Sequence, residues 1–186
     1  MGDPKRQRKK FETPRHPWRV DVLGEELKLL GQFGLRNKRE LWKHETQLTK
    51  YRDIARSLLA MPPERRARLE SELLAKLFNL GLVEEGASVE NVLDLVVQDI
   101  LERRFQTQVS RLGLAKTLCQ SRQLIIHGHI YVGDRKLTSP SCLVKRGAES
   151  KITFSPDSPL NKAEHPVRKA LSVVPSTQGT EVNKDE

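Results

Sequence analysis

Apolar side chains recur at the spacing of an α-helix through the N-terminal part of the chain. The first stripe ends at Gly34 and is made by Leu23, Leu27, Leu30 and Phe33. The second runs up to Met61, where Pro62-Pro63 stop it, and is made by Leu41, Leu48, Tyr51, Ala55 and Leu58. The third starts near Pro63, ends at Gly81 and is made by Leu69, Leu73, Leu77 and Leu80. No stripe is sustained over successive heptads, so the pattern predicts packed core helices and not a coiled coil.

A fourth helical pattern extends from Gln98 to about Leu112. Its inward positions are Ile100, Leu101, Phe105, Val109 and Leu112. This spacing predicts one continuous helix that leads from the N-terminal helices into the next segment.

A short helix followed by a hairpin is predicted over residues 116–138. The apolar positions that can face a core are Leu118, Cys119, Ile125 and Ile126. The positions left for a polar partner are Lys116, Thr117, Gln120, Ser121 and Gln123. Gly128 then breaks the helix, and Ile130 and Val132 alternate with polar residues as in a half-buried strand. Gly133-Asp134 supplies the turn through which the chain returns along residues 136–138.

The overall charge favours a polyanionic partner. The chain has 186 residues, with 33 Lys and Arg against 24 Asp and Glu, a formal net charge of +9 and a sequence pI near 9.8. No stretch reaches the roughly 20 apolar residues of a membrane-spanning helix, and the charged first residues do not resemble a secretory signal. We therefore expect a cytoplasmic protein that does not bind membranes.

Charge is unevenly distributed along the chain. Residues 1–20 hold seven basic residues against Asp3 and Glu12, and several prolines. This composition predicts an extended basic arm that orders along phosphates, the alternative being a solvated tail. Residues 77–102 carry six acidic residues and no Lys or Arg, so this surface should face away from RNA or meet a basic protein. Residues 156–186 are rich in Pro, Ser and Thr and are expected to be extended or disordered.

Neither a metal site nor a catalytic site is predicted. Cys119 and Cys142 are too few and too far apart for a zinc knuckle or a disulfide scaffold, and we expect both in the core. His127 and His129 have no third ligand nearby in sequence. Phosphate-binding loops, nucleophile elbows and metalloprotease motifs do not occur, so we expect no cofactor.

The order of residues from 103 to 155 resembles the αL-type RNA-binding module named after small-subunit ribosomal protein S-four. The matching segments are Arg111-Leu112-Gly113-Leu114-Ala115, Ser121-Arg122-Gln123-Leu124-Ile125, His127-Gly128-His129-Ile130-Tyr131-Val132, Pro140-Ser141 with Val144, and Lys151-Ile152-Thr153-Phe154. Two positions depart from the family pattern: Ser121, where the family often has Ala, and Gly147-Ala148-Glu149, where it has Gly-Asp.

Similar modules are also attached to pseudouridine synthases and some tRNA synthetases, so the N-terminal part decides between the families. Its segments resemble the S-four ribosomal protein family in its archaeal and eukaryotic form: Thr13-Pro14-Arg15-His16-Pro17-Trp18, Glu26-Leu27-Lys28-Leu29-Leu30-Gly31, Gly34-Leu35-Arg36-Asn37-Lys38-Arg39-Glu40-Leu41-Trp42 and Leu101-Glu102-Arg103-Arg104. The resemblance implies an α+β fold in which a mostly helical domain accompanies the small module, whose helices are followed by a short antiparallel sheet. We therefore expect an arm (1–20), a helical rRNA-binding domain (21–102), the module (103–155) and a tail (156–186). The module would be inserted into or flanked by the helical domain.

The candidate RNA-binding residues carry amide, aromatic or positively charged side chains on polar faces. They are Lys5, Arg6, Arg8, Lys9, Lys10 and Arg15 in the arm, Arg36, Lys38, Arg39, Lys43, Lys50 and Arg52 in the helical domain, and Arg111, Lys116, Arg122, Gln123, His127, His129, Tyr131, Arg135 and Lys136 in the module. Arg122 is the leading candidate, and a salt bridge to a neighbouring acid is its alternative role. Trp18 and Trp42 could stack on bases, but their apolar neighbours favour anchoring of the helical core.

The resemblance implies a structural component of the small ribosomal subunit and not an enzyme. Its partners would be small-subunit rRNA at a junction of several helices, neighbouring ribosomal proteins and messenger RNA where it enters the subunit. The protein would be a monomer within the ribosome. An RNA-modifying enzyme, or another factor that handles tRNA or rRNA with the same module, is the alternative.

Overall fold

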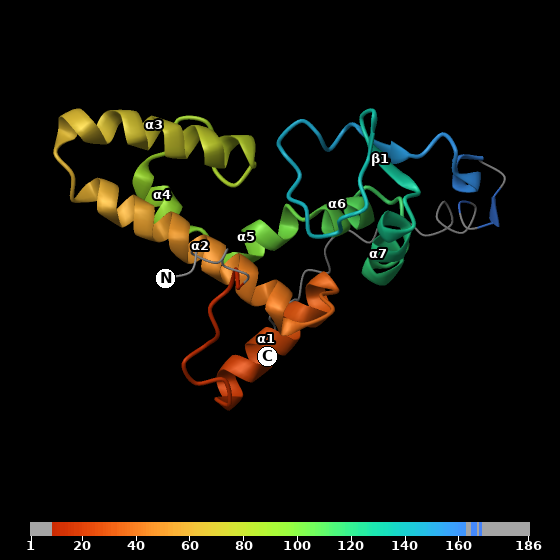
Figure 1. Cartoon of the computed structure of the whole chain (residues 1–186), viewed down its shortest axis with the longest axis horizontal. Coiled ribbons are helices and arrows are strands. Elements are labelled where there is room, and N and C mark those ends of the chain that lie inside the picture. The colour runs from red at the N-terminus through yellow and green to blue at the C-terminus, as the bar shows by residue number, and fades with distance from the viewer. Residues whose placement is uncertain (1–8, 163–164, 167, 169–186) are drawn as a thin grey trace, which may run out of the picture.

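The computed structural model describes residues 9–162 together with His165, Pro166 and Arg168. The N-terminal part, here called the helical half, contains α1 (Val20–Phe33), α2 (Lys38–Leu59), α3 (Pro63–Asn79), α4 (Val89–Asp94) and α5 (Val97–Glu102). α2 and α3 form a helical hairpin, α4 packs against α2, and α1 meets the N-terminal end of α2 (Figure 1).

Local chemistry sets the boundaries of these helices. The side chain of Asn37 caps α2 by accepting the backbone N–H of Glu40 at 3.2 Å. Pro63 starts α3, where a backbone N–H would have no helical partner. Gly34 ends α1 with φ 57°, and a Cβ on this residue would lie 2.7 Å from the Cβ of Leu118. Only glycine fits this conformation and this close approach.

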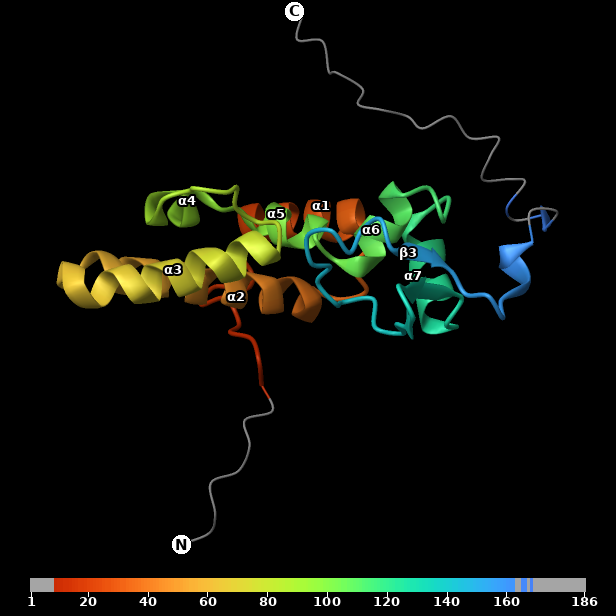
Figure 2. The ribbon, with the colours of Figure 1, turned by 90° about the horizontal axis from the view of Figure 1, so that it is seen from above.

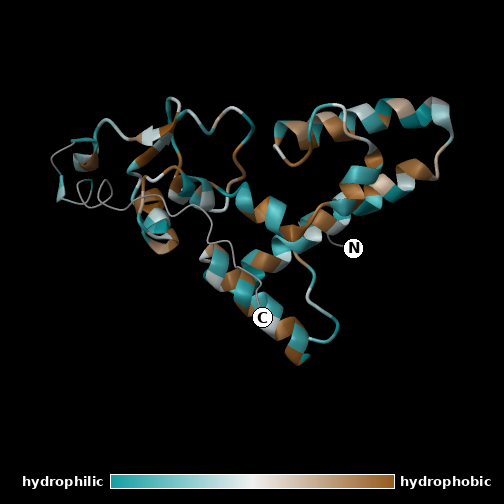
Figure 3. Cartoon of the chain, turned by 180° about the vertical axis from the view of Figure 1, so that it is seen from behind, coloured by the Kyte–Doolittle hydropathy of each residue, from teal (hydrophilic) through white to brown (hydrophobic). Residues whose placement is uncertain are grey.

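The core of the helical half follows the predicted stripe of α2. The predictions for Leu27 in α1 and Leu69 in α3 are wrong, because these side chains are 60% and 42% exposed. All five apolar positions predicted for α2 are buried, and four of them pack with α3, α4 and Ile100 around Leu73, Leu77, Val89 and Val92. A smaller cluster joins α1, α2 and α5 through Phe33, Leu35, Leu41 and Leu101. Hydrophobic and hydrophilic residues alternate along these helices (Figure 3), as expected for helices with one buried face.

The C-terminal part, here called the module, combines short helices with an antiparallel sheet. It contains α6 (Phe105–Arg111), α7 (Leu118–Ile126), β1 (Ile130–Val132), β2 (Arg135–Lys136) and β3 (Ile152–Phe154). The strands are ordered β2-β1-β3, and Tyr131 lies opposite both Lys136 and Thr153. The core of the module is built around Phe105, Val109, Ile125, Ile130 and Ile152. The predicted α+β class, a mostly helical domain with a small module, is confirmed.

The helix predicted from Gln98 to Leu112 is instead two helices, α5 and α6. Arg104 separates them in an extended conformation and forms a β-bridge with Leu143. The N–H of Phe105 donates to the carbonyl of Cys142 at 2.8 Å, so a distant loop replaces the helical hydrogen bond. Leu112, predicted to point inward, is 45% exposed. The prediction is wrong because the apolar spacing does not reveal this tertiary pairing.

The buried face of α7 also differs from the prediction. Leu124, Ile125 and Ser121 are buried, whereas Ile126 is 52% exposed and Cys119 is exposed. Ser121 tolerates burial because its hydroxyl donates to the carbonyl of Thr117 at 3.1 Å.

The remaining core predictions are borne out in part for Cys142 and Trp42 and are wrong for Trp18. Cys142 is half-buried and packs against the module core. Trp42 is half-buried, and its indole N–H donates to Glu26 at 2.8 Å. Trp18 is 86% exposed, so it does not anchor the helical core.

Residues 155–162 fold back on the module, although an extended tail was predicted from residue 156. The N–H of Ser155 donates to the carbonyl of His129 at 2.8 Å. Pro159–Asn161 form a 3-10 turn that buries Leu160 in the module core. Lys5, Arg6, Arg8 and most of the predicted tail lie outside the described residues.

The helical half and the module follow one another along the long axis of the molecule (Figure 2). Among the described residues, the helices of the helical half precede the module in sequence. Among the described residues, no helix combines the length and apolar character needed to cross a membrane.

Candidate nucleic-acid interface

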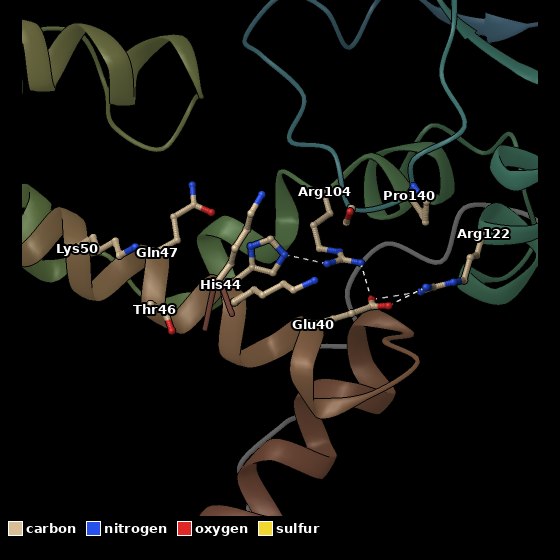
Figure 4. A pocket seen from close by; sticks show the side chains of 11 residues that line it. Glu40, His44, Thr46, Gln47, Lys50, Arg104, Arg122 and Pro140 are labelled. Atoms are coloured by element: carbon tan, nitrogen blue, oxygen red, sulfur yellow. Dashed lines mark hydrogen bonds and ion pairs between the residues drawn. The ribbon is translucent and has the colours of Figure 1, made fainter. Parts of the chain in front are cut away.

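A cavity of about 490 Å³ lies where the helical half meets the module (Figure 4). We call it the interlobe cavity. α2 forms one wall, and the opposite wall comes from the α5–α6 link, α7 and the loop before β3. Its lining residues are Lys10, Glu40, Lys43, His44, Thr46, Gln47, Lys50, Arg104, Arg122, Pro140 and Ser141.

The arm reaches this cavity because its described end is held on α2. The Phe11 ring lies 5.9 Å from the Trp42 ring, and the N–H of Glu12 donates to the hydroxyl of Thr46 at 3.0 Å. Lys9 lies over the Phe11 ring at 5.5 Å. These contacts place Lys10 at the rim of the cavity, while Arg15 is exposed further along the chain.

Glu40 connects the two walls of the cavity. Its carboxylate accepts hydrogen bonds from Arg122 of α7 at 2.7 and 3.2 Å, and from Arg104 at 2.8 Å. Burial raises the pKa of Glu40, but the hydrogen bond from Arg122 and the charges of Arg104 and Arg122 outweigh it, so the pKa lies below its ordinary value. Glu40 is therefore ionised at neutral pH and fully engaged by guanidinium groups.

Arg104 and His44 form the buried floor of the same network. Arg104 is fully buried, and its Nη1 donates to Nε2 of His44 at 2.8 Å. A guanidinium can only donate, so Nε2 accepts and the ring is neutral with its proton on Nδ1. Burial, together with the charge of Arg104, lowers the pKa of His44 to about 4. Burial also lowers the pKa of Arg104, although Glu40 opposes this effect.

Gln106 ties the halves together beside this network. Its buried amide donates to the carbonyls of Gly34 and Leu118 at 3.0 Å each. The end of α1 and the start of α7 are thus held by a single side chain. The walls of the interlobe cavity are fixed by polar contacts across the two halves.

The basic residues predicted on the helical half fall into two groups. Lys38 is paired with Glu26 at 2.7 Å, and Arg52 donates to the carbonyl of Leu95 at 2.6 Å, so both are engaged within the chain. The remaining predicted residues are exposed and have no ion pair within the described part of the chain: Arg36, Arg39, Lys43 and Lys50. Lys43 and Lys50 open onto the cavity.

The predicted module residues are divided in the same way. Arg111 is paired with Glu102 at 2.8 Å, Arg122 with Glu40, and His129 shares a 2.9 Å hydrogen bond with Ser158. Those that are exposed and have no ion pair in the described part of the chain are Lys116, Gln123, His127, Arg135 and Lys136. Tyr131 is half-buried in β1. Across the described residues, no His, Cys, Asp and Glu side chains cluster in a way that could hold a metal ion.

Comparison with known proteins agrees with this two-part organisation. Residues 5–102 match the family described as "Ribosomal protein S4/S9 N-terminal domain", and residues 103–150 match the "S4 domain". Small ribosomal subunit protein uS4 of Ignicoccus hospitalis is 50% identical over 87% of this chain and 98% of its own length. The chain belongs to the uS4 family. The uS4 proteins of Hyperthermus butylicus (51% identical; 87% of this chain, 92% of theirs) and Sulfurisphaera tokodaii (47%; 97% of both) are similarly close.

The junction between the two matched regions of this uS4-family chain falls at the network described above. Arg104 is the second residue after this junction, and it donates to Glu40, which also accepts from Arg122. The boundary between the helical half and the module therefore lies at the buried network that forms the floor of the interlobe cavity.

Sequence reasoning missed the residues that build the cavity walls: Glu40, His44, Arg104 and Gln106. One signal was present, because Arg104 lies directly between an apolar helix face and Phe105, where an unpaired charge would be costly. Nothing local in the sequence identifies its partners, which lie 60 and 64 positions away.

Proposed function

We propose that this chain is a structural component of the small ribosomal subunit in the cytoplasm. It binds small-subunit rRNA, clamps a junction where several helices meet, and acts early in assembly. It fixes the geometry of that junction by neutralising phosphates and matching shape. The names of its relatives and its membership of their family support this proposal.

One structural observation carries the RNA-binding part of the proposal. Exposed ammonium groups from the arm and from α2 open onto the interlobe cavity, where Glu40 is already neutralised by two guanidinium groups. The module carries further exposed cations without an ion pair in the described part of the chain, at Lys116, Arg135 and Lys136. A polyanion that contacts both halves satisfies all of these groups at once.

We propose further partners from the membership of the uS4 family and from the acidic stretch of the chain. Neighbouring ribosomal proteins would contact the acidic stretch at residues 77–102, away from the RNA-binding surface. The chain would act as a monomer within the subunit, close to where messenger RNA enters, and contribute to the accuracy of translation. No chemistry is required of it, so we propose that it is not an enzyme.

The competing proposal is an RNA-modifying enzyme, or another RNA-handling factor, that captures its substrate with the module. Such an enzyme needs a separate catalytic domain with a positioned acid or base. The helical half instead matches a ribosomal family over residues 5–102, which favours the structural role.

The affinity of the full chain for a folded small-subunit rRNA transcript tests the proposal. We expect the logarithm of the association constant to fall linearly with log salt, by about 0.7–0.9 per phosphate contacted. The folded transcript should bind more tightly than an unstructured strand of equal length. Equal affinity for both RNAs, or no dependence on salt, would refute the proposal.

Lys116→Ala is the cleaner test of a module contact, although Arg122 was the leading candidate. Arg122 holds Glu40 across the halves, so its removal changes the structure as well as any RNA contact. Lys116 is exposed before α7 and has no ion pair in the described part of the chain. Its removal should weaken binding to all RNAs and reduce the salt dependence by about one phosphate.

A further inference from the structure

We infer that the interlobe cavity binds one unstacked nucleotide of the rRNA, with its phosphate at the lysines of α2 and its base against the module wall. This inference rests on the proposed function and adds a specific site to it. The cavity would thus select a nucleotide displaced from its helix, in addition to the contacts that exposed basic residues make with phosphates.

The size and place of the cavity suit a single nucleotide better than a helix. Its volume of about 490 Å³ falls in the range of roughly 300–1,000 Å³ that is common for small-ligand pockets. It lies between the two halves, with α2 on one side and the α5–α6 link on the other (Figure 4). Single-stranded nucleotides at loops and junctions are the parts of folded RNA that can be splayed into such a pocket.

The charges around the cavity define a site for one phosphate. Lys10, Lys43 and Lys50 line it, and none has an ion-pair partner in the described part of the chain. The lining carboxylate, Glu40, is taken up by Arg104 and Arg122. An entering phosphate therefore meets free ammonium groups and no free carboxylate.

The opposite wall has the groups that a base requires. Arg122 presents a planar guanidinium, on which a base can stack, and Pro140 contributes an apolar ring. The hydroxyl of Ser141 is exposed at the rim and can donate to or accept from a base edge. This wall contacts the flat face and the edge of a base, whereas the lysines contact its phosphate.

The buried network keeps the site open before RNA binds. Arg122 donates two hydrogen bonds to Glu40. Glu40 also accepts a hydrogen bond from Arg104, which in turn donates to His44. The guanidinium of Arg122 therefore needs little further ordering when a base stacks on it. Such preorganisation lowers the cost of binding.

A variant that fills the cavity without changing charge tests this inference. Ser141→Trp places an indole at the cavity rim, and Ser150→Trp makes the same change at an exposed loop position outside it. We expect Ser141→Trp to weaken binding of the folded transcript about tenfold or more, the fold-change for loss of one base contact. Ser150→Trp should bind like the natural chain. Thermal unfolding of each variant verifies that it is folded.

Transcripts with a single abasic nucleotide, placed in turn at each unpaired position of the junction, identify the base. One position should weaken binding to the natural chain by the same factor as Ser141→Trp, and that loss should disappear in Ser141→Trp. If every abasic transcript bound equally well to the natural chain, or if Ser141→Trp bound the intact transcript normally, the inference would be wrong. The proposed function would survive either result, because it fails only if the natural chain does not prefer the folded transcript or binds it without dependence on salt.

The phosphate contact has a separate test with a charge-matched control. Lys43→Ala should reduce the salt dependence of binding by about one phosphate, whereas Lys28→Ala, which removes an exposed charge from α1, should not. Titration with adenosine monophosphate distinguishes an RNA nucleotide from a free one. We expect at most weak binding that the transcript displaces, and tight binding unaffected by the transcript would overturn the inference.

Discussion

The carboxylate of Glu40 and the guanidinium of Arg122 lie 2.7 Å apart, although 82 positions separate these residues in the chain. The contact joins α2 to α7 and therefore joins the helical half to the module. Arg104 completes it from the link between the two halves. This small ionic network helps to hold the helical half and the module in their relative positions. The shape of the RNA-binding surface depends on those positions.

Glu40→Ala should lower the free energy of unfolding by about 3 kcal/mol, because it leaves the buried charge of Arg104 without its carboxylate. Urea denaturation at pH 7 measures this loss. Glu72→Ala is the matched control: Glu72 forms an exposed pair with Arg68 at 3.2 Å, so its removal should cost less than about 1 kcal/mol. Similar losses in the two variants would show that the Glu40 network does not hold the halves together.

Stability should fall as the pH is lowered from 7 to 5, because His44 stays neutral in the folded state. Its pKa falls from 6.5 to about 4 on folding, so the unfolded chain binds a proton that the folded chain does not. The effect is absent well above pH 6.5, grows as the pH falls towards 4, and amounts to about 2 kcal/mol between pH 7 and 5. Glu40 contributes in a lower window, since its pKa is depressed from 4.5.

His44→Gln isolates this effect in urea denaturation at both pH values. The variant should be less stable than the natural chain at pH 7 but should lose about 2 kcal/mol less between pH 7 and 5. His16→Gln, at an exposed position of the arm, should retain the natural pH dependence. An unchanged pH dependence in His44→Gln would contradict the neutral state of this ring.

Gly34→Ala should destabilise the fold by about 1–3 kcal/mol, because Gly34 has φ 57° and a Cβ would lie 2.7 Å from the Cβ of Leu118. The opposite sign is expected for Gly24→Ala. Gly24 lies within α1 with no atom within 4 Å of an added Cβ, and alanine should stabilise this helix by about 0.5–1 kcal/mol. Thermal unfolding of the two variants should therefore give midpoints on opposite sides of the natural value.

The two tryptophans should respond differently to removal. Trp18→Ala should change the free energy of unfolding by less than about 0.5 kcal/mol, because its side chain is 86% exposed. Trp42→Ala should cost about 2 kcal/mol or more, since Trp42 contacts Phe11 and donates a hydrogen bond to Glu26. Chemical denaturation compares them, and a large loss in Trp18→Ala would show that the arm is packed differently.

The helices and the hairpin were largely predictable because their signals are local. Apolar residues at helical spacing located α2 and α3, and the prolines located the boundary between them. Gly34 located the end of α1, and alternation with Gly133 located the turn between β1 and β2. The net charge of the chain and the excess of basic residues in residues 1–20 indicated a polyanionic partner. These features depend on residues close together in sequence, where backbone conformation and hydrophobic period decide the outcome.

The interlobe cavity depended on contacts that no local pattern encodes. The break at Arg104 arises from pairing with a loop about 40 positions away, and the roles of Glu40, His44 and Gln106 arise from partners on the opposite half. Among the predicted basic residues, only the tertiary structure separates Lys43 and Lys50, which stay free, from Lys38 and Arg52, which are engaged internally. Sequence determined that this chain is helical, basic and suited to RNA, since those properties are sums over neighbouring residues. Which charges remain available to RNA was decided by folding, because a charge is free only if no distant partner is brought beside it.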